Sequence, residues 1–204
     1  MTDVARAAPS TDATPDGDAS TSASAHPFPT RLLVAAVIGA AVSVALGVYG
    51  RVHVPTGGVI TTFGFPSLLP MKAWFATLAI ALGIVQVLSA MAMWGRLPGV
   101  RHAPRWLPLM HRWTGTAAFL VSLPVAYHCL WSLGFQTTST RVVIHSLLGC
   151  AFYGAFTTKM LALRIDGLPS RALPVIGGVL FALLTGLWLT SALWFFTTVG
   201  FPGV

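Results

Sequence analysis

Two histidines lie inside apolar segments of membrane-spanning length, and they are the side chains best suited to chemistry. His128 lies near the end of the segment 110–133, and His145 lies near the start of the segment 142–163. A short link joins the two segments, so we expect an antiparallel pair of helices with both imidazoles at nearly the same depth. Intramembrane histidines are costly unless a partner satisfies them, and neutral imidazoles are common ligands of haem iron. The pair therefore predicts one b-type haem, with His128 and His145 as its metal ligands.

The residues around this histidine pair suit a flat, largely apolar cofactor with charged propionates. Gly149 lies four residues after His145, on the same helix face, and leaves room for a macrocycle. His53, just past the first apolar segment, is a rival axial ligand or a propionate contact. Cations for the propionates are expected on the same side of the membrane: Arg51, Lys72 and Arg141. Gly149, Arg141 and His53 thus join the two ligands as expected cofactor-binding residues.

Two alternatives for the histidines stay open. His128 and His145 could hydrogen-bond each other, a serine or a backbone carbonyl as interhelical contacts, worth of order 1 kcal/mol in a membrane. His111 lies 17 residues before His128, or about 25 Å along a helix, so one haem cannot use both. On the side of His111 only His102 remains as a partner, so we favour His111 as an interfacial residue over a second haem.

The composition requires a lipid environment for these segments. The chain has 204 residues, of which 55% are hydrophobic and 8% charged, with a mean hydropathy of +0.77. A soluble domain of this size could not bury that much apolar surface in one core. We predict an all-α, integral membrane helical bundle of about five transmembrane helices in a lipid bilayer. The expected spans are 31–50, 71–94, 110–133, 142–163 and 173–198.

Residues 1–29 differ from the rest of the chain. They are rich in Ala, Ser, Thr, Asp and Pro and show no apolar periodicity, which predicts a disordered N-terminal tail before a membrane bundle over 30–204. Four of the five acidic residues lie in this tail, the fifth is Asp166, and there is no glutamate. Carboxylates inside membrane helices carry protons and coupled cations, so their absence argues against an ion-coupled transporter.

The basic residues predict orientation rather than a nucleic-acid partner. They are scattered at the ends of apolar segments, which is unlike a nucleic-acid-binding surface. With the N-terminus inside, nine Lys and Arg fall on the inner side and three on the outer side, which predicts a cytoplasmic N-terminus in the cell membrane. The connection 51–70 is expected to lie on the outer surface of the bundle, as a lid. Cys129 and Cys150 are expected at different depths, as free thiols.

Hydroxyl and aromatic side chains in the last segment, Thr190, Ser191 and Trp194, are expected at the level of the haem. They could wall the pocket or seat a quinone ring. The alternative, which we favour, is that the two hydroxyls bond back to helix carbonyls and the indole anchors the membrane interface.

The histidine layout resembles a known group of proteins. His111-Arg112-x-x-Gly115 opens one segment, His128 lies near its far end, and His145-x-x-x-Gly149 opens the next. Over residues 71–198 this layout is similar to small bacterial ferric-reductase-like and cytochrome b561-like membrane haem proteins. The resemblance implies a bundle that binds haem b and passes electrons, with His128 and His145 as axial ligands. Two-haem members place two histidines on each of two helices, whereas here the fourth segment has only His145.

The function expected from these observations is that of a membrane b-type cytochrome subunit. Because no glycine-rich nucleotide loop follows any segment, its electron donor is expected to be a quinone or a separate redox protein, with a partner at the outer face. It could serve as the electron-transfer subunit of an oxidoreductase within a larger complex. The alternatives are a cofactor-free scaffold or assembly subunit and, less favoured, a small-solute transporter.

Overall fold

A computed structural model describes residues 28–100 and 102–200 of the chain. Residues 28 and 29, which we expected in the tail, already belong to the first helix, where Pro29 lies in the first turn, a position that suits proline. The rest of the expected tail lies outside the described residues.

The described residues are helical and contain no strand, as the apolar segments predict. The elements are α1 Phe28–Val52, α2 Leu68–Met93, α3 Leu107–Tyr127, η1 His128–Leu133, α4 Thr140–Ala162, α5 Ala172–Trp188, η2 Leu189–Leu193 and α6 Trp194–Thr198. The elements η1 and η2 are π-helical and continue α3 and α5 without a break, so the chain forms five rods.

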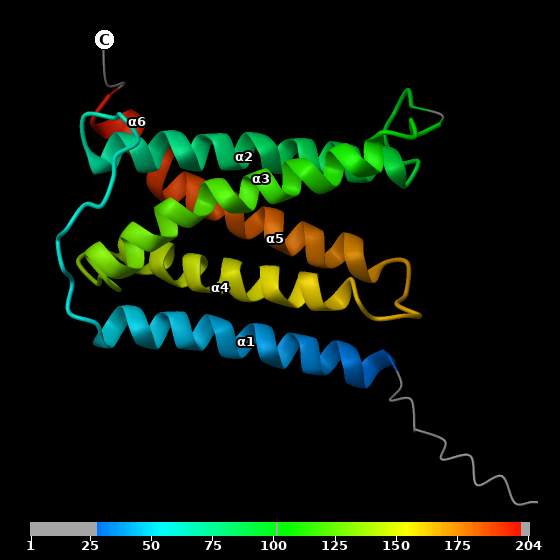
Figure 1. Ribbon diagram of the computed structural model, residues 1–204, viewed down its shortest axis with the longest axis horizontal. Helices are drawn as coiled ribbons and strands as arrows, with labels where there is room; N and C mark the ends of the chain where they lie inside the picture. The colour runs from blue at the N-terminus through cyan, green and yellow to red at the C-terminus, as the bar shows by residue number, and fades with distance from the viewer. Residues whose placement is uncertain (1–27, 101, 201–204) are drawn as a thin grey trace, which may run out of the picture.

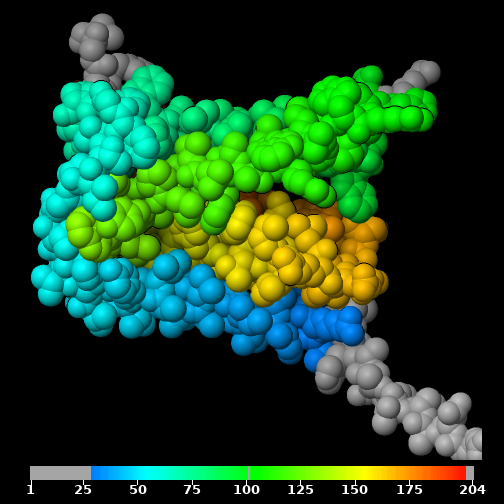
Figure 2. Space-filling model, viewed as in Figure 1, coloured from blue at the N-terminus to red at the C-terminus, as the bar shows by residue number. Residues whose placement is uncertain are grey.

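The five rods run side by side, with successive rods antiparallel (Figure 1). The rod α4 packs against α1 and α5, and α2 packs against α3 and α5. The helix α3 makes its extensive contacts with α2 and not with α4, although α4 follows it in the sequence. A space-filling view shows α1, α4 and α3 on one face, with the surface hollowed between α3 and α4 (Figure 2).

Four of the rods are long and apolar enough to cross a membrane: Pro29–Val52, Leu68–Met93, Leu107–Leu133 and Ala172–Thr198. The helix α4 is less apolar because it carries Arg141, His145 and Lys159, yet its 23 residues span about 34 Å. It lies between α1 and α5, where neighbouring helices replace lipid. The chain is therefore a multi-pass membrane protein with an all-helical bundle.

Glycines bring α1 and α4 into backbone contact. A Cβ atom on Gly39 would lie 2.5 Å from the Gly154 carbonyl oxygen, and a Cβ on Gly154 would collide with the Gly39 carbonyl and the Ser43 hydroxyl. Thr158 adds a hydrogen bond from its hydroxyl to the Ala35 carbonyl, 3.4 Å long. Close backbone approach at small residues is a common way to pack membrane helices, because van der Waals contact drives their association.

Each π-helical segment lies at the same end of the bundle as the links 53–67 and 134–139. Pro124 lies inside α3, four residues before η1, and it has no N–H to donate to the preceding turn. The wide turns of η1 leave carbonyls that the link 53–67 satisfies: the Gly57 N–H donates to the Ser132 oxygen at 3.0 Å. This link therefore lies against η1 at one end of the bundle, and the lid expected there stays a prediction.

Candidate functional site

A cavity separates α3 and η1 from α4 and α5, and it has two adjoining chambers. The deep chamber has a volume of about 110 Å³ and is lined mainly by apolar side chains such as Leu184, Leu187 and Phe152. The mouth chamber has a volume of about 270 Å³ and reaches the link 134–139. Both chambers share Val125, Cys129, Gly134, His145, Ser146 and Ser191 as lining residues. Concave, mostly apolar sites with a few convergent polar groups are where small molecules and cofactors bind.

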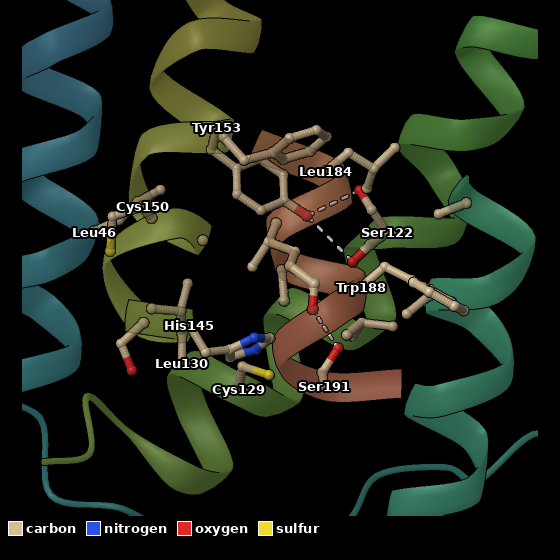
Figure 3. Close-up of a pocket in the computed structure, with 18 of the residues that line it drawn as sticks. Leu46, Ser122, Cys129, Leu130, His145, Cys150, Tyr153, Leu184, Trp188 and Ser191 are labelled. Atoms are coloured by element: carbon tan, nitrogen blue, oxygen red, sulfur yellow. Dashed lines mark hydrogen bonds between the residues drawn. The ribbon is translucent and has the colours of Figure 1, made fainter. Parts of the chain in front are cut away.

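His145 projects from α4 onto the wall of both chambers (Figure 3). Its Nδ1 lies 3.0 Å from the Thr190 hydroxyl oxygen. That hydroxyl donates its own proton to the Gly186 carbonyl at 2.7 Å, so it accepts from the imidazole and fixes the proton of His145 on Nδ1. The Nε2 atom is then left with a free lone pair, which is the arrangement of a metal-ligating histidine held by a second residue.

His128 resembles His145 in donating a hydrogen bond from Nδ1, but it lies in a different position. Its Nδ1 donates to the Pro124 carbonyl at 2.7 Å, because a carbonyl oxygen can only accept. Its Nε2 is buried and has no hydrogen-bond partner. However, His128 is not among the lining residues of either chamber. Both histidines thus donate from Nδ1, but only His145 lies on the cavity wall.

Cys129, the neighbour of His128, does line both chambers. Its thiol lies within hydrogen-bonding reach of the His145 imidazole and the Lys72 ammonium group. Both cysteines are free thiols, as their separation in depth predicted. The importance of Cys129 was missed at the sequence level, because only the fold brings Lys72 of α2 and His145 of α4 to it.

Two cations line the mouth chamber, Lys72 and Arg141. The Arg141 guanidinium stacks 3.9 Å over the Trp194 ring and donates to the Thr190 carbonyl oxygen at 2.6 Å. Within the described ranges the only acidic residue is Asp166, in the link 163–171 at the opposite end of the bundle. The mouth therefore has a positive charge that no carboxylate of the described chain compensates.

Of the two other residues expected to bind the cofactor, Gly149 lines the cavity and His53 does not. Gly149 lines the deep chamber, and a Cβ there would make an ordinary contact of 3.9 Å with Leu187, so it adds modest room. His53 lies in the link 53–67, where it stacks on Tyr49 and donates from Nε2 to the Trp131 carbonyl at 3.0 Å. It lines neither chamber, and its contacts hold the link against η1.

The hydroxyl residues of η2 bond back to helix carbonyls, as we favoured, and they also line the cavity. Ser191 donates to the Leu187 carbonyl at 2.6 Å, and Thr190 bonds back to Gly186 as described above, so both satisfy helix carbonyls. Both nevertheless line the mouth chamber, and Ser191 also lines the deep one. On the far side of the deep chamber, Tyr153 and Ser122 bridge α4 and α3 with an O–O distance of 2.9 Å.

His111 lies in a separate polar cluster between α2 and α3. Ser89 donates to the Gln86 carbonyl and accepts from His111 Nδ1, 2.7 Å away. Gln86 donates to the His111 carbonyl and to the Thr114 hydroxyl, each at 2.6 Å. His111 therefore serves as an interhelical contact. No group of three or more His, Cys, Asp or Glu side chains suited to a metal ion occurs in the described part of the chain.

The fold and cavity define a class: a multi-pass helical membrane protein with an imidazole and a thiol facing a cavity that has a cationic mouth. The chain belongs to DUF6529, described as a family of unknown function, whose model matches residues 32–203. No curated protein and no solved structure matches the chain.

Proposed function

We propose that this chain is a membrane b-type cytochrome subunit that relays electrons between a quinone or a separate redox protein and a partner at the outer face. The observation that carries the proposal is His145. It lines a mostly apolar cavity, and Thr190 accepts from its Nδ1, which leaves Nε2 unprotonated, as an axial haem ligand requires.

The residues around the cavity fit a haem in chemistry. His145 from α4 would supply one axial ligand, and η1 would supply the other, with His128 as the imidazole expected there. The buried, unpartnered Nε2 of His128 suits an axial haem ligand. Its position does not, because His128 lines neither chamber of the cavity. When bound, haem b supplies one-electron transfer at its iron.

The chain's own groups would orient and shield this cofactor. Thr190 holds the plane and tautomer of the His145 ring, and Leu184, Leu187 and Phe152 exclude water from the deep chamber. Lys72 and Arg141 supply positive charge at the mouth, where the propionate groups of a haem need polar partners. The separation of α3 from α4 favours a flat molecule between them, since consecutive antiparallel helices otherwise tend to pack directly.

The proposal includes an orientation. The end of the bundle with the links 94–106 and 163–171 carries most of the basic residues, and the cavity end carries Arg51, Lys72 and Arg141. By the positive-inside rule, the N-terminus lies in the cytoplasm of a cell whose cytoplasmic membrane holds the protein, and the cavity lies near the outer face.

The test is an absorbance spectrum of the detergent-purified protein before and after addition of dithionite. We expect reduced-minus-oxidised haem bands at about one haem per chain. They should be lost in His145→Ala and kept in His111→Ala, a matched control in the α2–α3 interface. A colourless wild-type protein that elutes as a single folded species, even after hemin is added, contradicts the proposal.

A cofactor-free scaffold or assembly subunit is the second candidate, and one observation favours it. Three histidines join separate elements: His145 bonds to η2, His53 to η1 and His111 to α2. Structural contacts of this kind need no cofactor. A colourless but stable preparation whose Tm falls in His145→Ala would support this candidate. Nothing in the described residues favours the solute transporter.

A further inference from the structure

We propose that Cys129, and not His128, is the second axial ligand of the haem, so that the site is a thiolate–imidazole site. This inference rests on the proposed function and names the donor set of the same cavity. Neighbouring positions on η1 present different side chains to the cavity: Cys129 lines both chambers, and His128 lines neither.

The thiol and the His145 imidazole come together at the cavity from different elements. Cys129 comes from η1 and His145 from α4, and the two side chains lie side by side (Figure 3). The thiol is within hydrogen-bonding reach of the imidazole, which already donates from Nδ1 to Thr190, so Nε2 is the nitrogen left to face a ligand. Cysteine thiolate and neutral imidazole are both established donors to haem iron.

Lys72 supplies the charge that a buried thiolate needs. Lys72 and Cys129 both line the mouth chamber, so the ammonium charge lies near the thiol. As a ligand of the haem, Cys129 would be a thiolate whose proton has been released to water, with no change in oxidation state. Lys72 is a positioning residue, since a thiolate is the ligand form of cysteine and a nearby cation stabilises it.

His128 would have to move to replace Cys129. One residue step along a helix rotates a side chain by about 100°, so bringing the imidazole to the cavity requires a comparable turn of η1. That turn would break the 2.7 Å bond from His128 to Pro124 and the bonds from Gly57 and His53 to the carbonyls of η1. Cys129 needs no such movement.

The consequence for the cofactor is electronic. An anionic thiolate pushes electron density onto iron and favours the ferric state, unlike a second neutral imidazole. The ferrous–CO complex and the ferric spectra therefore distinguish the two ligand sets without a measurement of activity.

The experiment compares purified wild type, Cys129→Ser, Cys150→Ser and His128→Ala by absorbance, ferric EPR and the spectrum of the ferrous–CO complex. Cys150 is the matched control, because it also lines the deep chamber but its sulfur lies near Gly47 of α1, 3.7 Å from where a Cβ would be. We expect thiolate-type spectra in wild type, Cys150→Ser and His128→Ala. In Cys129→Ser these spectra should be lost, and haem retention should fall by about ten-fold or more.

A second variant keeps the test decisive if Cys129→Ser does not fold. Cys129→His should keep the haem and convert the spectra to the bis-imidazole type. The inference is overturned if wild type shows bis-imidazole spectra, Cys129→Ser leaves those spectra unchanged and His128→Ala abolishes them. In that case the proposed function still stands. A wild type without haem overturns both.

Discussion

Replacing Thr190 by Val tests whether the imidazole of His145 is prepared for a metal. Valine keeps the shape of threonine and the backbone carbonyl that accepts from Arg141, but it removes the hydroxyl that accepts from His145 Nδ1. The buried N–H then has no acceptor, which costs about 1–3 kcal/mol. The ring also becomes free to flip or to carry its proton on Nε2. Because a factor of ten corresponds to about 1.4 kcal/mol, we expect haem affinity to fall roughly 10–100-fold.

The assay is a titration of haem into the haem-depleted protein in detergent, followed by absorbance. Thr197→Val is the matched control: its hydroxyl also bonds back to a helix carbonyl, at 2.9 Å from the Leu193 oxygen, but it is exposed and remote from His145. Wild-type affinity in Thr190→Val, or an equal loss in Thr197→Val, would refute the reasoning, since either result means that this hydrogen bond does not prepare the ligand.

Three further predictions follow from other contacts. Gly39→Ala should lower the free energy of unfolding by about 1–3 kcal/mol, measured as a lower Tm in detergent, because the added Cβ would lie 2.5 Å from the Gly154 carbonyl oxygen. Gly47→Ala is the control, since its Cβ would lie 3.7 Å from the nearest sulfur and should leave the Tm unchanged. Equal Tm values for the two variants would contradict this packing. Gln86→Leu should cost about 1–3 kcal/mol, measured the same way, because Thr114 and the His111 carbonyl lose a donor; an unchanged Tm would mean that water or lipid replaces it. A reporter fused before the first helix should be protected from external protease in intact cells, and cleavage there would reverse the proposed orientation.

Helix positions were largely predictable from the sequence, and helix neighbours were not. The expected span 173–198 is Ala172–Thr198 in the structure, and the expected span 110–133 is Leu107–Leu133, so the bounds agree within three residues. Apolar length decides where a helix can cross a membrane, so these bounds follow from composition. The short link 134–139 predicted that α3 and α4 would pack together, whereas each packs mainly on other helices. Aromatic side chains fill part of the space between them, such as Phe119 and Phe156 stacked at 4.3 Å.

The direction of side chains near the cavity was beyond sequence reasoning, because it depends on π-helical turns. We expected His128 to face the next helix, but in the structure Cys129 lines the cavity and His128 does not. Arg141, expected to serve a cofactor, already has two protein partners, Trp194 and the Thr190 carbonyl. His53 was expected near the cofactor because it lies on the same side of the membrane, but its bond to Trp131 holds it against the outer face of η1.

The close contact between Gly39 and Gly154 has a consequence for how the protein is assembled. The helices that it joins are separated in the sequence by two complete spans, and α4 finds its other main partner, α5, only after itself. During synthesis α1 is already present when α4 is made, but α5 is not, so the contacts of α4 are completed only when the last helix has been inserted. Arg141 likewise obtains its two partners only when η2 and α6 arrive. Assembly is therefore expected to be late and cooperative, with the half-made chain dependent on insertion factors that shield charged membrane helices.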